Sequence, residues 1–444
     1  MTASTTGLPF QILILDNVVS NAGDAAIAIA MKRSLEATFG TGAIVRHCFC
    51  GPTSEPGIFR DYYPELSFTR TLWHCESDWS LRKWNIVGRL KRKSAAIRFP
   101  LQARLRRRGL PLSVLFAHER ALFRLFEESS LVVVTGGAPL CTSWTPRYLR
   151  PLRTAQYRAA LLLGKPLVFY SQSFGPFSPD DDLPGLLRPV MEQANAILCR
   201  DSESVRVVRE VIGVSSDNVH ETIDEALTIE PRPPTREPAP PRKLPVRIGV
   251  CVHQWNWLGQ ADPQRCQREF ESRIAAVCEQ LMDDASVELV LLTTHQTGSD
   301  DVHSDLDVSV RVVSMIPERL QPRVQVVSSF VHPCEFAHFM GQCDVVLSSR
   351  LHGAVLSLVG GAPAIALEYE PKTRGLMRRL GLEDWVLSMA DSTSADITCA
   401  IRKILDDRRD ADQRRQAGVA EGRRVAARSG DIVRRATEPR ATGE

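Results

Sequence analysis

The chain alternates short apolar runs with longer amphipathic stretches over most of its length. The apolar runs hold six to eight residues, the usual length of a strand, and stretches such as 24–39 and 147–164 repeat apolar side chains at helical intervals. Before residue 230 this pattern predicts strands at 11–16, 43–49, 131–137, 166–172 and 196–201. After residue 245 it predicts strands at 246–252, 287–294, 324–329, 345–350 and 362–368.

Alternation of strands with helices favours an α/β fold, in which parallel sheets are covered by helices on both faces. The predicted strands are continuous apolar runs, which is typical of strands buried on both sides. Ligands of such folds bind at the carboxyl ends of the strands, so chemistry is expected there.

A proline-rich segment separates two halves that share this rhythm. Residues 230–245 contain seven prolines, which remove backbone donors and fix φ, so the segment is interpreted as an extended linker. We expect a first domain at 1–229, a second at 246–392 that faces it across a cleft, and a helical tail at 393–444. Residues 50–112 break the rhythm and are interpreted as an insertion in the first domain.

Charge is the main feature of this insertion. Segment 82–108 holds eleven Lys or Arg residues and no acid, although the net charge of the whole chain is only +3. Such a segment suits anionic lipid headgroups or a polyprenyl-diphosphate carrier, and the plainer reading is a solvated insertion. The small net charge and the few interleaved aromatic residues argue against a nucleic-acid partner.

Composition also bears on location. No basic segment precedes the first apolar run, so we expect no cleaved signal peptide, and no stretch approaches the roughly 18–20 apolar residues of a spanning helix. The expected location is the cytoplasm, with peripheral contact to the inner face of the membrane. The eleven cysteines include no CxxC pair and are interpreted as reduced thiols, and we expect no metal site.

The strongest chemical signal is the motif SSRLHG, in which a predicted strand ends and an apolar helix opens at His352 and Gly353. The free N–H groups and the dipole of a helix N-terminus attract anions. Arg350 adds a planar fork suited to carboxylate or phosphate, and His352 adds a group that moves protons near neutral pH. Glu368 and Lys372 follow the next strand. The plainer interpretation is a structural arginine and a helix-capping histidine.

Further motifs follow other predicted strands. Asn21 and Asp24 lie in the turn after the first strand, where Asp24 is well placed to cap the next helix. The other motifs more often mark turns of a fold than bind a ligand, and they contribute Gly136, Gly137, Gln172 and Arg200.

Together these residues resemble the polysaccharide pyruvyl transferase family. The resemblance rests on NxGD after the first strand, GG after a middle strand, SQSFGP, CRDSES, the aspartate of DEAL, and SSRLHG followed by YEPKTRGLMRRLGL. It runs from about residue 12 to about residue 388, with a gap over 50–112. SRLHG followed by a lysine-bearing segment is its most specific part.

The resemblance implies a GT-B-like fold of two Rossmann-like, doubly wound domains. It implies phosphoenolpyruvate as the donor substrate, no further cofactor, and a saccharide acceptor, free, polymeric or lipid-linked, that gains a pyruvate ketal. On this chain Arg350 and His352 would bind the donor and transfer protons, with Asp24 or Glu368 as the second acid–base group. The other donor-site candidates are Gly353, Lys372, Asn21, Gly136, Gly137, Gln172 and Arg200.

Two positions depart from the family pattern. Ala138 stands where a third glycine is frequent, and the strand after the linker continues as VCVHQWNW in place of an arginine-bearing segment. Trp255 and Trp257 of that segment suit stacking on a sugar face. These departures concern the acceptor more than the donor.

Two other functions use the same features. A GT-B-type glycosyltransferase would hold the diphosphate of a nucleotide sugar at the same helix N-terminus and would use Glu368 for the ribose. A non-catalytic saccharide-binding protein would keep the fold without turnover, although the presence of Arg350 and His352 speaks against it. The identity of the donor separates the three.

Overall fold

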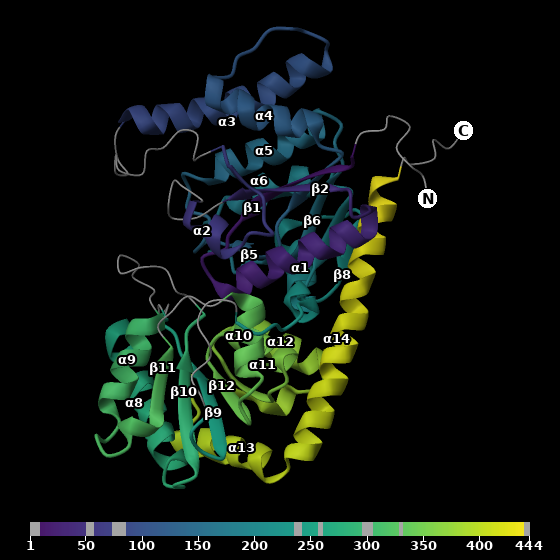
Figure 1. Cartoon of the computed structure of the whole chain (residues 1–444). Coiled ribbons are helices and arrows are strands. Elements are labelled where there is room, and N and C mark those ends of the chain that lie inside the picture. Colours follow the sequence, from purple (N-terminus) through teal and green to yellow (C-terminus); the bar gives the residue numbers. More distant parts are fainter. Residues whose placement is uncertain are drawn as a thin grey trace. The chain divides into compact units, whose positions relative to one another are not determined.

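The computed structural model describes residues 9–49, 57–72, 86–234, 242–255, 261–294, 305–327 and 332–438. The described residues form two compact units (Figure 1) that are interleaved in the sequence. Unit 1 draws on Met1–Val19, Ile27–Glu225 and Val425–Glu444, and unit 2 on Ser20–Ala26 and Ala226–Arg424. Residues 20–26, which include the start of the first helix at Ala22, therefore belong to the second unit although the strand before them belongs to the first.

Unit 1 is built on a parallel sheet in the order β3-β2-β1-β4-β6-β7-β8, with β5 paired to β6. Its strands are β1 Gln11–Asn17, β2 Ile44–Phe49, β3 Phe68–Arg70, β4 Leu131–Val134, β5 Gly137–Leu140, β6 Leu167–Phe174, β7 Ala196–Cys199 and β8 Val219–Glu221. Its helices are α1 Ala22–Phe39, α2 Gly57–Tyr62, α3 Ile86–Arg107, α4 Ala117–Glu128, α5 Arg150–Leu162, α6 Leu183–Met191 and α7 Ser202–Arg206.

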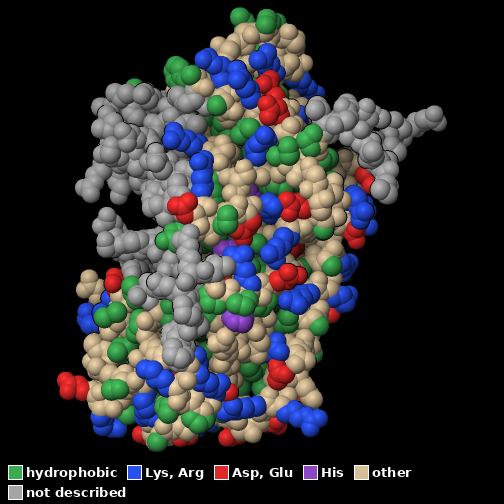
Figure 2. Space-filling view, viewed as in Figure 1, with side chains coloured by type: hydrophobic (Ala, Val, Ile, Leu, Met, Phe, Trp, Pro, Cys, Tyr) green, Lys and Arg blue, Asp and Glu red, His purple; other side chains and the backbone are tan. Residues whose placement is uncertain are grey.

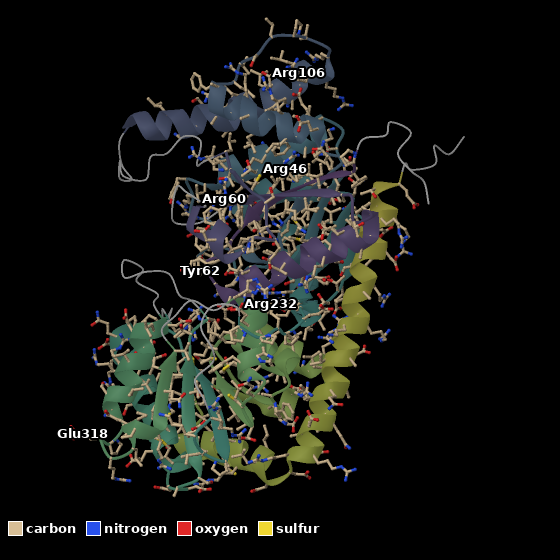
Figure 3. The ribbon with its side chains drawn as sticks, viewed as in Figure 1. Arg46, Arg60, Tyr62, Arg106, Arg232 and Glu318 are labelled. Atoms are coloured by element: carbon tan, nitrogen blue, oxygen red, sulfur yellow. The ribbon has the colours of Figure 1, made fainter. Side chains whose placement is uncertain are left out.

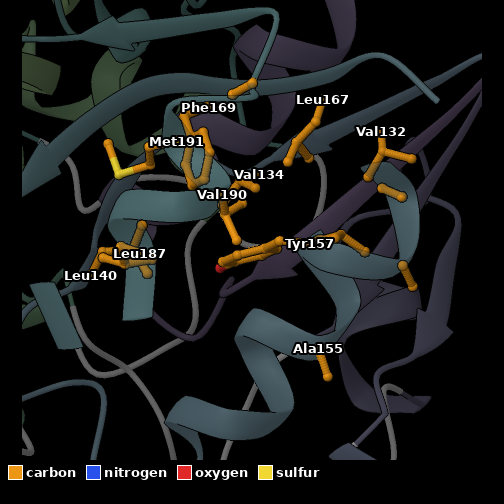
Figure 4. Close-up of a cluster of buried hydrophobic side chains, with 14 of the residues drawn as sticks. Val132, Val134, Leu140, Ala155, Tyr157, Leu167, Phe169, Leu187, Val190 and Met191 are labelled. Carbon is orange, nitrogen blue, oxygen red and sulfur yellow. The ribbon is translucent and has the colours of Figure 1, made fainter. Parts of the chain in front are cut away.

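The strands of unit 1 bury both faces of the sheet. Successive side chains of a strand point to opposite faces. Val132 and Leu167 accordingly join a cluster with Tyr157 of α5 (Figure 4), whereas Leu131 and Val168 join a second cluster. Continuous apolar runs are required because helices cover both sides.

Unit 2 has a parallel sheet in the order β11-β10-β9-β12-β13-β14. Its strands are β9 Val246–Cys251, β10 Val287–Leu292, β11 Val324–Val327, β12 Val345–Ser348, β13 Ala364–Glu368 and β14 Val386–Ser388. The helices that follow in the chain are α8 Pro263–Leu281, α9 Asp305–Met315, α10 Pro333–Met340, α11 Leu351–Gly360, α12 Pro371–Arg379, α13 Ser394–Asp406 and α14 Arg408–Thr437. The strand order reverses between β9 and β12, which is the topological switch point of a doubly wound sheet. The predicted α/β class, with two Rossmann-like units, is confirmed.

The predicted insertion contributes to the body of unit 1. β3 pairs in parallel with β2, and Ala95, Phe99 and Ala103 of α3 are buried in the hydrophobic core. These three residues repeat every four positions and so share one face of the helix. The interpretation of 82–108 as a solvated insertion is therefore wrong for this face of the helix, because the many Lys and Arg residues mask the spacing of its buried side chains.

The proline-rich segment is described only at its ends. The backbone N–H of Arg232 (Figure 3) donates to the carbonyl of Cys334 at 3.0 Å, and that of Lys243 donates to Glu288 Oε2 at 2.8 Å. Both ends thus pack within unit 2. Residues 235–241 lie outside the described residues, and the linker at 230–245 stays a prediction.

A buried histidine is expected to make the stability of unit 1 depend on pH. Burial, assisted by Lys32, lowers the pKa of His47 on β2 from 6.5 to about 3. The unfolded chain takes up the proton near pH 6.5 and the folded one only near pH 3, so stability is full above pH 6.5 and falls by up to about 1.4 kcal/mol per unit below it.

The variant His47→Leu removes the titrating imidazole and so tests this pH dependence of stability. Between pH 7.5 and pH 5, wild type should lose about 2 kcal/mol more of its unfolding free energy than the variant, because the other titrating groups are common to both. Denaturant titration at the two pH values measures the difference. Equal losses would show that His47 titrates alike in the folded and unfolded chains.

Candidate functional site

The SSRLHG motif lies at the switch point of unit 2, where β12 leads into α11. The N–H of Ser349 donates to the carbonyl of Cys251 at the end of β9 at 2.9 Å, and Ser348 Oγ donates to the carbonyl of Arg350 at 2.7 Å. At Gly353 a Cβ atom would lie 2.3 Å from Ser348 Oγ, so only glycine lets α11 begin so close to the strands. The N–H groups of the first turn have no acceptor within the helix, and the positive end of the helix dipole lies at this point.

Arg350 is held by a carboxylate that the sequence pattern did not reveal. Its Nε and Nη2 donate to the two oxygens of Asp305, the first residue of α9, at 3.0 and 2.6 Å. Asp305 is fully buried and also accepts from Thr294 Oγ1 at 3.1 Å. Burial acts to lower the pKa of Arg350, but Asp305, Tyr369 and Asp24 outweigh it and raise that pKa. The guanidinium is therefore a fixed, permanently charged group.

Residues 20–26, at the start of α1, bring a second set of predicted residues to the same place. The prediction that Asp24 caps this helix is wrong, because α1 begins at Ala22 and Asp24 lies inside its first turn. The N–H of Ala22 donates to the carbonyl of Thr294 at 2.8 Å, and Asn21 Oδ1 accepts from the N–H of Gly23 at 2.8 Å. A Cβ atom at Gly23 would lie 2.1 Å from His352 Cγ, so the imidazole sits directly on this glycine. Asp24 follows at once and is one of the charges that act on Arg350. Asp24, Arg350 and His352 thus lie together in unit 2.

An aromatic cluster flanks these groups. His253 is buried at the end of β9, and its Nδ1 lies 2.7 Å from Ser349 Oγ. The Tyr369 ring centroid is 4.9 Å from that of His253 and 4.2 Å from that of Trp255. Trp257, the other predicted sugar-stacking residue, lies outside the described residues. Trp255 and Tyr369 form the apolar side of the site.

Glu368 and Lys372 stand at the next strand end. Glu368 Oε2 accepts from Arg374 Nε at 2.8 Å, and Lys372 forms an ion pair with Glu370. The Lys372 Nζ atom also lies 5.9 Å from the centre of the Tyr369 ring. Both predicted groups are thus near the aromatic cluster and already engaged by opposite charges.

The remaining predicted residues lie in unit 1. A Cβ atom at Gly136 would lie 2.6 Å from Ile27 Cγ2, and Gly137 has a φ of +100°, so both positions favour glycine for packing or backbone reasons. Arg200 is buried in an ion pair with Asp224 at 2.6 Å, the aspartate of the DEAL motif. These three residues have structural roles in the described fold.

Gln172 differs from them. It is fully buried on β6, and neither its Oε1 nor its Nε2 has a hydrogen-bond partner in the described parts of the chain. Buried amides are almost always hydrogen-bonded, so a group beyond the described residues is expected to satisfy it.

A buried polar network at the end of β1 escaped the sequence analysis. Asp16 has a φ of 60°, accepts a hydrogen bond from Tyr157 and lies 3.6 Å from Arg153 Nε. Burial raises its pKa, against the opposing effects of Arg153 and Tyr157. Asn17 donates to Thr135 Oγ1 at 3.0 Å. Asp16 begins the DNVVSN segment, but in the sequence it is the last residue of the predicted strand 11–16, and nothing marks it as part of a polar network.

Two other features bear on chemistry and location. Among the residues that the structure describes, no group of three His, Cys, Asp or Glu side chains is arranged to hold a metal ion. Over the same residues, no helix combines the length and the hydropathy needed to cross a bilayer.

Solved structures share the fold of this chain. A glycosyltransferase from Rickettsia africae has a TM-score of 0.55 at 10% identity and covers 96% of both chains. A UDP-forming α,α-trehalose-phosphate synthase from Burkholderia xenovorans has a TM-score of 0.54 at 14% identity, over 98% of this chain and 100% of that one. The UDP-GlcNAc 2-epimerase of Neisseria meningitidis, bound to UDP-GlcNAc, has a TM-score of 0.53 at 10% identity, over 94% and 98%. These likenesses show the GT-B type of fold.

Sequence comparison adds the family. The amylovoran biosynthesis protein AmsJ of Erwinia amylovora is 25% identical over 284 residues, which cover 62% of this chain and 66% of AmsJ. The model of the family named polysaccharide pyruvyl transferase matches residues 21–371, from the Asn21 turn through the SSRLHG motif to the start of α12. This chain belongs to the polysaccharide pyruvyl transferase family.

Proposed function

We propose that this chain transfers pyruvate from phosphoenolpyruvate to a saccharide as a ketal and releases inorganic phosphate, in the biosynthesis of a polysaccharide or glycolipid. One observation carries the proposal: Asp24, Arg350 and His352 meet at the N-terminus of α11. Fixed positive charge, the positive end of a helix and a proton carrier are what a small phosphorylated enol requires.

Arg350 keeps donors for the substrate. A guanidinium has five N–H groups, and Asp305 engages Nε and Nη2, so Nη1 remains to face an anion. Lys372 is the second cation in range of the aromatic cluster. Arg350, Lys372 and the N–H groups of 351–353 would share the phosphate and the carboxylate of the donor.

The reaction has two stages, addition of a first hydroxyl and replacement of phosphate by a second, and each stage needs two proton transfers. Protonation of the methylene carbon of phosphoenolpyruvate leaves positive charge on the adjacent carbon. A sugar hydroxyl adds to that carbon and loses its proton; the C–O bond to phosphate then breaks, and a second hydroxyl of the same sugar adds and closes the ring. Of the two hydroxyl protons, one replaces the proton given to the methyl group and the other leaves with phosphate.

His352 is the proposed proton donor to carbon. Its ring rests on Gly23, and the next residue, Asp24, is one of the charges that act on Arg350. Glu368 is the other candidate base, but Oε2 of its carboxylate accepts from Arg374. The geometry therefore favours Asp24 as the partner of His352 for removing the hydroxyl proton.

The isotope content of the product tests this chemistry. With phosphoenolpyruvate and a panel of hexopyranosides in deuterated water, the ketal methyl should carry at least one solvent deuterium, and inorganic phosphate should appear in equal amount. Mass spectrometry and a phosphate assay measure both. A methyl group free of deuterium would exclude protonation of the donor carbon.

The alternative donor is a nucleotide sugar. Glu368 stands at the end of β13, where a ribose-binding carboxylate of such enzymes would lie. In the same assay, release of a nucleoside diphosphate would establish the glycosyltransferase reading. Saccharide binding without turnover of either donor would establish a non-catalytic role.

A methyl group at Gly23 is expected to disable the site without unfolding the chain. The Cβ atom of Gly23→Ala would meet His352 Cγ at 2.1 Å, so the imidazole must move. Displacement of a catalytic group by about 1 Å costs on the order of 10²-fold in rate. Gly185→Ala on α6 is the matched control, because a Cβ atom there meets nothing within 4 Å. Equal turnover of the two variants would separate His352 from the chemistry.

A further inference from the structure

We propose that the outward face of α3 docks unit 1 on an anionic lipid surface. The helix carries two apolar stripes, whereas a helix at the surface of a globular protein needs only one. The first stripe, with Ala95, Phe99 and Ala103, packs in the core of unit 1. The second lies on the opposite side of the helix.

The second stripe is exposed. Leu90, Ile97 and Leu101 are separated by seven and four residues and therefore share one face. Their exposed fractions are 61%, 68% and 40%, and Leu112, just beyond the helix, is 63% exposed. Six of the twelve large hydrophobic side chains that are exposed in the described residues fall between Leu90 and Phe116. A concentration of this kind marks an interaction surface.

Basic side chains border the exposed stripe. Lys93, Arg104 and Arg108 are exposed on the same face, at helical intervals from Ile97 and Leu101. None of the three forms a salt bridge with another described residue. Figure 2 shows Lys and Arg side chains beside hydrophobic ones in this part of unit 1. The stripe is thus apolar in the middle and positive along its edge.

Two other arginines of the helix have acidic partners. Arg98 pairs with Glu119 at 2.5 Å, and Arg106 (Figure 3) pairs with Glu127 at 3.0 Å, both acids being on α4. Arg98 and Arg106 are therefore neutralised by α4, whereas Lys93, Arg104 and Arg108 beside the exposed stripe have no such partner among the described residues.

This combination fits a bilayer surface. Amphipathic helices that lie in the headgroup region bury an apolar stripe and place Lys and Arg against anionic lipids. A nucleic acid would use the cations, but it has no use for exposed aliphatic side chains such as Leu90 and Ile97. The proposal concerns unit 1 alone and is independent of the transfer reaction.

Vesicle flotation of the full-length chain tests it. We expect binding to vesicles of phosphatidylcholine mixed with phosphatidylglycerol, weak binding to phosphatidylcholine alone, and release at about 1 M salt. Each basic residue near an anionic surface contributes roughly fivefold to the partition coefficient, so K93E/R104E/R108E should lower it by about 100-fold or more.

A second variant isolates the apolar stripe. L90E/I97E should also abolish flotation, whereas V310E, a change at a 54% exposed position on α9, should not. Unchanged thermal melting would confirm that each variant folds. The proposal would be overturned if the wild-type chain did not float with anionic vesicles or bound neutral vesicles equally well. It would also be overturned if V310E lost binding to the same extent, or if the same basic and apolar residues bound single-stranded RNA with similar affinity.

Discussion

Replacement of His352 by alanine is expected to lower turnover by about 10²–10⁴-fold and to leave donor affinity nearly unchanged. The imidazole rests on Gly23 beside Asp24, and Arg350, two residues earlier in the chain, carries the permanent charge. Loss of the imidazole thus removes proton transfer and keeps the anion site.

The split between rate and binding is the useful measurement. Turnover is followed by phosphate release, and donor affinity by calorimetry with phosphoenolpyruvate. His338→Ala, on α10 of the same unit, is a control that removes an exposed contact of an imidazole with Gln342, whose Nε2 lies 3.2 Å from His338 Nε2. Near-normal turnover of His352→Ala would remove His352 from the mechanism.

Replacement of Arg350 by alanine is expected to act on binding. A hydrogen bond to a charged group contributes about 1.5–3 kcal/mol, so donor affinity should fall by about 10–150-fold. The change also leaves Asp305 buried without its guanidinium, and breaking a buried pair destabilises a fold by about 3–5 kcal/mol. Loss of affinity in this variant alone therefore mixes two effects.

A double-variant cycle separates them. Asp305→Ala and Arg350→Ala should each lower the unfolding free energy, and the double variant should recover part of it because no charge is left unpaired. Donor affinity should stay low in the double variant. Recovery of donor affinity together with stability would show that Arg350 only supports the fold. Arg378→Ala, which breaks an exposed pair with Glu383, is the control for loss of a cation.

Most of the fold was predictable because both sheets are parallel and buried on both faces. Strands such as β4 and β12 are therefore unbroken apolar runs that stand out from their surroundings. β3 was not predicted, because a three-residue edge strand leaves no such pattern. The inner face of α3 was missed because residues 95, 99 and 103 are spaced among basic side chains.

The candidate site was predictable only in its local part. Arg350 and His352 lie in one motif at a strand end, where parallel sheets place chemistry. Asp305 lies 45 residues away, in a stretch with no clear pattern, and nothing local marks it as the partner of Arg350. Likewise, the sequence marks Gly23 as a turn residue, and only packing reveals its contact with His352.

Ligand-induced stabilisation tests the central claim, that this site takes phosphoenolpyruvate. At about 100 times its dissociation constant, phosphoenolpyruvate should add about 2.7 kcal/mol to the unfolding free energy of the wild-type chain and much less to that of Arg350→Ala. UDP-sugars and nucleoside diphosphates at the same concentration should add little. Stabilisation by a nucleotide sugar and none by phosphoenolpyruvate would contradict the account.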